Sequence, residues 1–313
     1  MASESKGAVF AAMGANFGIA VGKTIAGALT GSAAMLAEAG HSVADTVNQV
    51  FLLIGINLSD ASADENHPHG YGKEAFFWSF LAAIFIFVAG ATFSFYEGIR
   101  TLIQDTSHHR SGGELAVAFS VLGFAFAFES VSGTVAVRAL ASSARQRGWS
   151  TLRYVREAPD PTTKTVFFED GAALTGLALA AAGLAVSALT GDEHWDGVAS
   201  ICIGVVLAVV ALILGVQSRQ LLLGAATDSE TRQAIHRVVA GFPEVERVVR
   251  ILTMQLGAHS VLVTGEIQVR SDLDVLRAED LIVRIDAKLA AEVPEVSTTF
   301  WELRRHAGGP SAG

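Results

Sequence analysis

The sequence predicts an α-helical membrane protein that ends in a small soluble domain of mixed α and β structure. Three observations lead to this prediction. First, 51% of the 313 residues are hydrophobic and only 17% are charged, whereas about a quarter of the residues of an ordinary soluble domain are charged. Second, the apolar residues gather in roughly five or six windows, each long enough to cross a bilayer. Third, the final third of the chain has an ordinary soluble composition.

The positions of the apolar windows predict six transmembrane helices. They are expected at residues 8–30, 33–58, 75–103, 114–140, 165–190 and 195–223. The longest polar connection, residues 141–164, follows the fourth span. The first apolar run lacks a clear small-residue cleavage site, so we interpret it as a retained span and not as a signal peptide.

Basic residues predict how the chain is oriented, because cytoplasmic loops carry an excess of lysine and arginine. The connection after the fourth span contains Arg145, Arg147, Arg153, Arg156 and Lys164. Lys73 follows the second span, whereas the loops on the opposite side hold little besides Arg110. We therefore expect an integral membrane protein with both termini in the cytoplasm, in a bacterial-type inner or plasma membrane.

The remainder of the chain is expected to form a cytoplasmic domain. Periodicity predicts helices at residues 230–240 and 276–291, and strands at 245–255, 260–269 and 296–303. The order α-β-β-α-β is typical of a small α+β sandwich. The predicted boundaries are 1–223 for the transmembrane domain, 224–306 for the soluble domain and 307–313 for a disordered tail.

Composition excludes several classes of function. The formal net charge of −9 argues against nucleic acid as a partner. Cys202 is the only cysteine, which excludes an intrachain disulfide and a metal site built from cysteines alone. The sequence contains no recognisable nucleophile–base pair and no His-Glu-x-x-His motif. We therefore expect neither an enzyme nor a bound cofactor.

The strongest functional signal lies inside the second span. His41 and Asp45 are four residues apart and Glu38 lies one turn earlier, so the three share one helix face. Asn48 is seven residues past His41 and shares that face as well. Ionisable side chains at membrane depth are costly and mark functional paths, and imidazole with carboxylate is ligand chemistry for a divalent transition metal. The alternative is a polar contact between helices.

Carboxylates on two other spans are candidates to complete such a site. Glu169 and Asp170 come early in the fifth span, and neighbouring residues lie about 100° apart on a helix, so both are not expected to face one ion. Asp170 is the preferred ligand of the two, and a helix-capping or ion-pairing role is the alternative. Glu129 stands in an apolar stretch of the fourth span, where it could bind metal, carry a proton or serve a structural role.

These motifs resemble the cation diffusion facilitator family. The resemblance is carried by His41-x-x-x-Asp45, by the segment 64–74 (DENHPHGYGKE) and by the segment 196–204 (DGVASICIG). It implies a homodimer of six-helix membrane domains, a cytoplasmic ferredoxin-like domain and export of Zn²⁺ or a similar cation in exchange for protons. It also implies a second, loop metal site at Asp64, His67 and His69; without the resemblance, the histidines of this loop would be read as merely solvated.

The chain departs from the family pattern in the fifth span. The usual ligand positions there hold Ala172 and Gly176, or Ala173 and Leu177, depending on the register. The Glu169-Asp170-Gly-Ala-Ala segment resembles the branch that contains mitochondrial zinc-transporter-like proteins, in which a glutamate at the position of Glu129 is also typical. The soluble domain lacks the late histidine and aspartate ligands of the family.

The sequence thus predicts a proton-coupled efflux transporter for a divalent cation that works by alternating access. Zn²⁺ leads as the transported ion, and the oxygen-rich ligand set also favours Mn²⁺ and Fe²⁺. Metal binding needs deprotonated ligands and releases protons, which gives antiport a physical cause. Two alternatives remain: a membrane regulator that kept the fold without transporting, and a metal-storing or metal-sensing protein whose soluble domain is the working part.

Overall fold

The structure is a computed structural model that describes residues 2–104 and 111–304. The predicted disordered tail, 307–313, lies outside the described residues. The described residues form two compact units. The first contains the long helices, and the second contains the chain from Gln220 onward together with the segment Asn57–Phe76 and residues 157–159.

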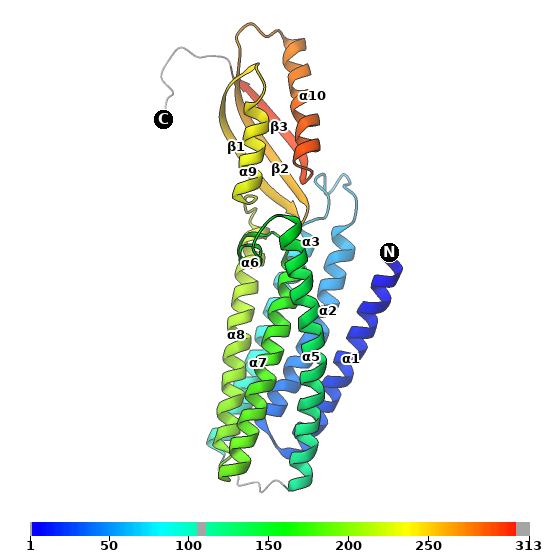
Figure 1. The fold of residues 1–313 in the computed structure, drawn as a ribbon, viewed down its shortest axis with the longest axis vertical. Helices are drawn as coiled ribbons and strands as arrows, with labels where there is room; N and C mark the ends of the chain where they lie inside the picture. Colours follow the sequence, from blue (N-terminus) through cyan, green and yellow to red (C-terminus); the bar gives the residue numbers. More distant parts are fainter. Residues whose placement is uncertain (1, 105–110, 305–313) are drawn as a thin grey trace. The chain divides into compact units, whose positions relative to one another are not determined.

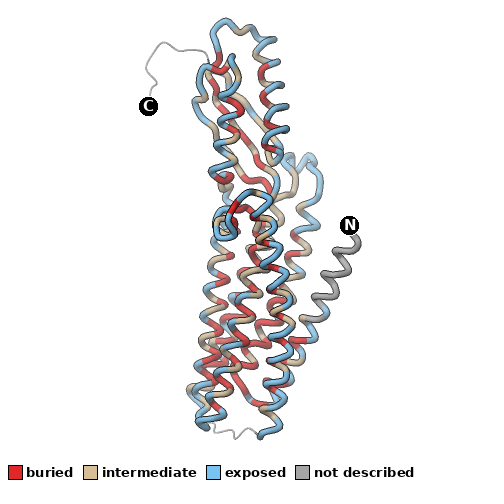
Figure 2. The backbone as a smooth tube through the Cα atoms, viewed as in Figure 1, coloured by how far each residue is buried: buried red, intermediate tan, exposed pale blue. Residues whose placement is uncertain are grey.

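The first unit is entirely helical (Figure 1). Its elements are α1 (Ala2–Thr30), α2 (Ala33–Ser59), α3 (Glu74–Phe85), the π-helical segment η1 (Ile86–Ala91), α4 (Thr92–Ile103), α5 (Gly112–Gln146), α6 (Thr151–Glu157), α7 (Pro161–Thr190) and α8 (His194–Leu222). Helix α5 packs against α1 and α7. Figure 2 shows buried positions recurring between exposed ones along these helices.

Four helical stretches of the described chain are long and apolar enough to cross a membrane. They are the continuous stretch α3–η1–α4 (Glu74–Ile103), α5, α7 and α8. Many large apolar side chains point outward from them, such as Phe124 (69% exposed) and Leu212 (67% exposed). Such an apolar exterior suits lipid better than water. The chain is therefore a helical membrane protein, as predicted. Helix α2 is not among the stretches that are long and apolar enough to cross a membrane.

Local signals explain where several helices begin and end. Ser111 and Glu114 form a capping box at the start of α5. Asp160 caps α7 and Pro161 occupies its first turn, so this helix begins before the predicted residue 165. Gly191 ends α7 with a φ of 70°, a left-handed conformation that glycine adopts without strain.

Asp196, in the first turn of α8, connects that helix to the start of α2. Its Oδ1 accepts a hydrogen bond of 2.7 Å from Ser32 Oγ, and its Oδ2 accepts one of 2.7 Å from the Ala33 backbone N–H. The carboxylate is fully buried. Asp196 therefore satisfies a backbone donor at the N-terminus of α2, which would otherwise be buried without a partner.

Small residues allow α4 and α8 to approach closely. A Cβ on Gly98 would lie 2.7 Å from the Gly197 carbonyl oxygen, so the two backbones are nearly in contact there. One turn further along α8, Ser200 Oγ donates a hydrogen bond of 2.8 Å to the Ser94 carbonyl. Close packing through small residues and short polar contacts is how helices associate in lipid.

The second unit folds as the sequence predicts. Its elements follow in the order α9 (Ser229–Ala240), β1 (Val245–Gly257), β2 (Ser260–Val269), α10 (Val275–Glu292) and β3 (Val296–Arg304). Strand β2 is central; it pairs antiparallel with β1 and parallel with β3. The parallel pair needs a crossover, which α10 provides. Buried apolar residues of both helices and of the sheet make up its core, including Ile235, Val263, Ile267, Leu281 and Ile285.

The segment Asn57–Phe76 belongs to this second unit. Gly72 lies against the end of β1, where a Cβ would be only 2.5 Å from the Leu256 carbonyl oxygen. Lys73 Nζ donates to Met254 Sδ at 3.7 Å. The sequence predicts this segment only as a polar connection between two spans, so its packing on the β1–β2 hairpin is a structural finding.

Candidate metal site

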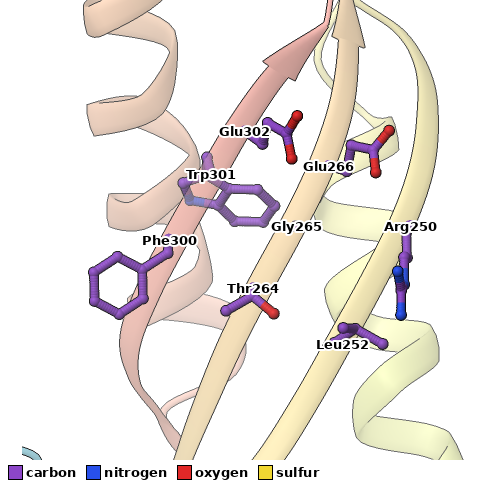
Figure 3. Close-up of a pocket in the computed structure, with 8 residues that line it drawn as sticks. All are labelled: Arg250, Leu252, Thr264, Gly265, Glu266, Phe300, Trp301 and Glu302. Atoms are coloured by element: carbon purple, nitrogen blue, oxygen red, sulfur yellow. The ribbon is translucent and has the colours of Figure 1, made fainter.

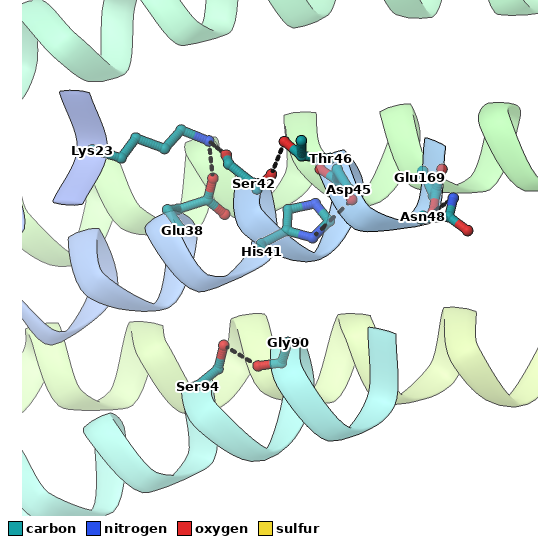
Figure 4. A network of polar contacts seen from close by, with 10 residues as sticks. All are labelled: Lys23, Glu38, His41, Ser42, Asp45, Thr46, Asn48, Gly90, Ser94 and Glu169. Carbon is teal, nitrogen blue, oxygen red and sulfur yellow. Dashed lines mark hydrogen bonds and ion pairs between the residues drawn. The ribbon is translucent and has the colours of Figure 1, made fainter. Parts of the chain in front are cut away.

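One face of α2 carries a line of buried polar residues. Glu38, His41, Asp45 and Asn48 recur at spacings of three and four residues, and all are buried; His41 is 1% exposed. Figure 4 shows them side by side along the helix. The shared face predicted from the spacing is therefore present, and it is turned into the helical unit.

His41 and Asp45 are close enough to act together. The His41 Nδ1 and the Asp45 Oδ1 are 3.5 Å apart. Within the described residues, neither ring nitrogen of His41 nor Oδ1 of Asp45 makes a hydrogen bond. Buried polar atoms without partners are uncommon, because no hydrogen bond offsets the free energy lost when they leave water. The pair thus offers unused nitrogen and oxygen lone pairs, which is what a metal ligand needs.

The carboxylate of α7 that reaches α2 is Glu169. Its Oε1 accepts a hydrogen bond from the Asn48 Nδ2, and its charge interacts with that of Asp45. Asp170 lies differently: its Oδ2 accepts a hydrogen bond of 3.1 Å from Ser132 Oγ on α5. The two neighbours therefore face different helices, as expected from the rotation of about 100° per residue. As a candidate metal ligand, Glu169 is favoured by the geometry, whereas Asp170 is favoured by the sequence.

Glu129 on α5 is also buried within this unit. Its charge interacts with those of Asp170 and Glu38, and with that of Asp45. It therefore belongs to the same acidic group as the carboxylates of α2 and α7.

Lys23 on α1 is a component that the sequence analysis missed. Its Nζ donates to Glu38 Oε2 at 2.9 Å and to Ser42 Oγ at 2.8 Å, and both Lys23 and Glu38 are fully buried (Figure 4). Its position as a single lysine within the first apolar run could have predicted a role, because charged residues at membrane depth mark functional positions. The Lys23–Glu38 ion pair lies one turn from His41.

No complete metal shell is gathered in this conformation. Among the described residues, no three His, Cys, Asp or Glu side chains come together closely enough to hold a metal ion. His41 and Asp45 supply two ligand groups, whereas Glu38 is held by Lys23 and Glu169 by Asn48. A third protein ligand would have to come from a carboxylate that this conformation does not bring to the pair.

The predicted loop site has a well-defined internal structure. Asp64 Oδ1 accepts hydrogen bonds from the backbone N–H of Asn66 (3.0 Å) and of His67 (2.7 Å). Tyr71 OH donates to Asp64 Oδ2 at 2.7 Å, and the His67 and Tyr71 rings lie 4.1 Å apart. These hydrogen bonds lower the pKa of Asp64, and the bond from Tyr71 has the largest effect. The bond between Tyr71 and Asp64 also raises the pKa of Tyr71.

The loop therefore has a structural explanation beside its predicted metal site. Asp64 stabilises the turn through three hydrogen bonds, as an aspartate commonly does in loops. His67 Nδ1 lies 3.5 Å from Asp64 Oδ1, and His69 is exposed. A metal bound to Asp64 Oδ2 would share this oxygen with the Tyr71 hydroxyl.

The second unit has one further surface feature, a depression of about 350 Å³ on the sheet (Figure 3). Its lining includes Arg250, Leu252, Glu266, Phe300 and Glu302. Arg304 Nε lies 2.5 Å from Glu266 Oε1, so this carboxylate already has a cationic partner. The depression lacks the convergent unpaired ligands that mark the α2 face.

Comparison with known proteins agrees with the motifs. Residues 9–223 match the family model of the cation efflux transmembrane domain. The human mitochondrial proton-coupled zinc antiporter SLC30A9 is 31% identical over 245 residues, which make up 78% of this chain and 42% of that protein. Metal tolerance protein C4 of Arabidopsis thaliana is 34% identical over 241 residues, 77% of this chain and 52% of that protein.

A bacterial relative aligns over more of its own length. The cation-efflux pump FieF of Shewanella oneidensis is 27% identical over 260 residues, 83% of this chain and 80% of that protein. By contrast, the chain spans about half or less of the length of the human and plant relatives. The family model covers most of the chain, and the chain therefore belongs to the cation efflux, or cation diffusion facilitator, family and resembles its mitochondrial zinc-transporter-like branch.

Proposed function

We propose that the chain is a proton-coupled efflux transporter for a divalent metal cation, with Zn²⁺ as the leading substrate. The observation that carries the proposal is the pair His41 and Asp45: both are buried on one helix face, the His41 Nδ1 and the Asp45 Oδ1 lie 3.5 Å apart, and neither ring nitrogen nor this oxygen has a hydrogen-bond partner among the described residues. Family membership and the zinc antiporter relatives support it. Neither an enzymatic activity nor a cofactor is part of the proposal.

Exchange of metal for protons follows from the chemistry of this pair. Imidazole and carboxylate bind a metal only when both are deprotonated, so metal entry expels protons and protonation expels metal. Imidazole changes its protonation near neutral pH. We propose that the cation enters from the cytoplasm, binds His41 and Asp45 with help from Glu169, and is displaced by protons after the helices expose the site to the other side.

The same proposal includes the architecture inferred from the sequence. Helices α1 and α2 would cross the membrane with the four apolar stretches, giving six spans, cytoplasmic termini and a cytoplasmic, ferredoxin-like domain within residues 224–306. The working unit would be a homodimer in a lipid membrane, with no nucleic-acid partner. Zn²⁺ suits a site with one imidazole, and the surrounding carboxylates keep Mn²⁺ and Fe²⁺ as candidates.

Transport into proteoliposomes with an imposed pH gradient tests the function. We expect uptake of Zn²⁺ or Mn²⁺ by the wild type and near-background uptake by Asp45→Ala. The exposed pair Asp192 and His194, whose Oδ1 and Nδ1 lie 2.5 Å apart, offers a matched control. Asp192→Ala should transport normally. Equal flux in the wild type and Asp45→Ala would remove the site assignment.

A non-transporting regulator is the second candidate. The observation that favours it is the engagement of Glu38 by Lys23 and of Glu169 by Asn48, which leaves no group of three ligands among the described residues. It predicts no flux of any divalent ion in an assay in which a known family transporter is active. A metal-sensing C-terminal domain is less well supported, because that domain has no cysteine and its described His, Asp and Glu side chains form no group of three that could hold a metal ion.

A further inference from the structure

Lys23 is a buried lysine on α1 whose charge is fully enclosed by protein. Its ammonium donates to Glu38 Oε2 (2.9 Å) and to Ser42 Oγ (2.8 Å), two residues that flank His41 on α2. Lys23 and Glu38 are both 0% exposed. A buried charge persists where it is paired, and this one is paired directly beside the proposed metal ligands.

Glu38 is held from two sides. Lys23 engages its Oε2, while its Oε1 lies against the backbone of α7 at Gly176, where a Cβ would be 2.0 Å from that oxygen. Within the described residues, Oε1 makes no hydrogen bond. The carboxylate therefore fills the space that a side chain at position 176 would take, and it retains one free oxygen.

The charge of Lys23 reaches beyond its direct partners. It interacts electrostatically with His41, with Asp45 and with Glu129. A dication bound by His41 and Asp45 would thus be repelled by a fixed ammonium nearby, while Glu38, the nearest carboxylate on the same helix face, is already neutralised by that ammonium.

We propose that Lys23 is a tethered cation that competes with the transported metal for Glu38 and so limits the affinity of the site. The proposal rests on the proposed function, because it concerns the same site. Lys23 keeps Glu38 out of the metal shell, and the bound ion is held by fewer negative charges than the residues around it could supply. A transport site must bind its ion and also release it, and a built-in competitor favours release.

The test is Zn²⁺ binding by the full chain in detergent, titrated with ZnCl₂ by calorimetry. Replacing Lys23 by an uncharged residue of similar shape, Lys23→Met, leaves Glu38 free to act on the metal. We expect binding about tenfold tighter or more, together with a lower KM and a lower maximal rate of Zn²⁺ flux in proteoliposomes. Lys23→Arg keeps the charge and should stay close to the wild type.

Two comparisons separate this role from a merely structural one. Lys164 is another buried lysine of the helical unit, whose charge interacts with Asp160 instead, so Lys164→Met should leave Zn²⁺ affinity unchanged. The double variant Lys23→Met with Glu38→Gln removes both charges of the pair and should return the affinity close to the wild-type value. A structural role predicts weaker binding in Lys23→Met and no recovery in the double variant.

The outcomes distinguish this inference from the function itself. If Asp45→Ala abolishes Zn²⁺ binding while Lys23→Met binds as the wild type does, the competitor role is overturned and the transporter stands. If the wild type neither binds nor transports a divalent ion, both are overturned. Should Lys23→Met fail to fold, Glu38→Gln leaves the ammonium unneutralised and should weaken binding about tenfold; unchanged affinity there would overturn the role as well.

Discussion

The carboxylate of Glu38 on α2 is packed against the backbone of Gly176 on α7, where a Cβ would lie 2.0 Å from Glu38 Oε1. Glycine at position 176 therefore makes room for a carboxylate from another helix. In one of the two registers that the family resemblance allows, position 176 is where a ligand is expected, and this packing gives a physical reason why the chain has no side chain there.

Gly176→Ala should destabilise the helical unit. The added methyl overlaps a buried carboxylate that Lys23 also holds, and overpacking of this kind costs about 1–3 kcal/mol. Denaturation in mixed micelles measures the loss. Gly171→Ala on the same helix is the matched control, because no atom lies within 4 Å of its Cβ position.

The destabilisation caused by Gly176→Ala should disappear when Glu38 is replaced by a shorter side chain. In a Glu38→Ala background the methyl at position 176 has space, so the two substitutions together should be less damaging than the sum of their separate effects. Purely additive effects would show that Gly176 is needed for another reason.

Glu169→Gln should reduce Zn²⁺ flux more than Asp170→Asn. Glu169 bonds to Asn48 on the polar face of α2, whereas Asp170 bonds to Ser132 on α5. Loss of a group that supports a metal site typically costs about tenfold or more in affinity or activity. Initial rates of Zn²⁺ uptake into proteoliposomes compare the two variants. A larger loss in Asp170→Asn would make Asp170 the preferred ligand again.

The hydrogen bond between Tyr71 and Asp64 should give the loop a pH range of stability. The folded-state pKa of Asp64 is lowered, so its contribution is present above the ordinary carboxyl pKa of about 3.9 and is lost as the pH falls through the lower folded value. The folded-state pKa of Tyr71 is raised, so its contribution is present below about pH 10 and is lost as the pH rises through the higher folded value.

This pairing can be read from the tyrosine absorbance, because the chain has only 3 tyrosines. Asp64→Asn should move the titration of one tyrosine down toward an ordinary pKa of about 10. Tyr154 should still titrate late, because burial and the carboxylate of Asp160 raise its pKa to about 12. An unchanged alkaline titration in Asp64→Asn would mean that the bond does not persist in solution.

Asp196→Ala should lower the free energy of unfolding by about 2 kcal/mol or more, because it leaves the buried donors of Ser32 and Ala33 without their acceptor. Asp192→Ala, at an exposed position just before α8, is the control and should change stability little. Equal effects of the two substitutions would contradict the capping role.

The order of elements could be predicted because long apolar runs and strict alternation are strong local signals. The α-β-β-α-β order of the C-terminal unit is confirmed, and its three strands begin at the predicted residues. The short helix α6 (Thr151–Glu157) was expected as polar connection, because a seven-residue helix has little periodicity to detect. The π-helical segment η1 also has no compositional signature.

The candidate site was predictable in part. The spacing of Glu38, His41, Asp45 and Asn48 is enough to place them on one face. The partners of that face could not be derived in the same way, because the contacts of Lys23 and Glu169 depend on how separate helices pack. The packing of Asn57–Phe76 against strand β1 is likewise a tertiary contact that no local pattern encodes.

The π-helical segment η1 changes the helical phase within the continuous stretch Glu74–Ile103. A π turn holds more residues than an α turn, and each inserted residue rotates everything after it by about 100°. Ser94 and Gly98, which contact Ser200 and Gly197, lie after this segment on α4. Deleting one residue within Ile86–Ala91 would therefore present different side chains of α4 to α8, although the span would be shortened by only about 1.5 Å.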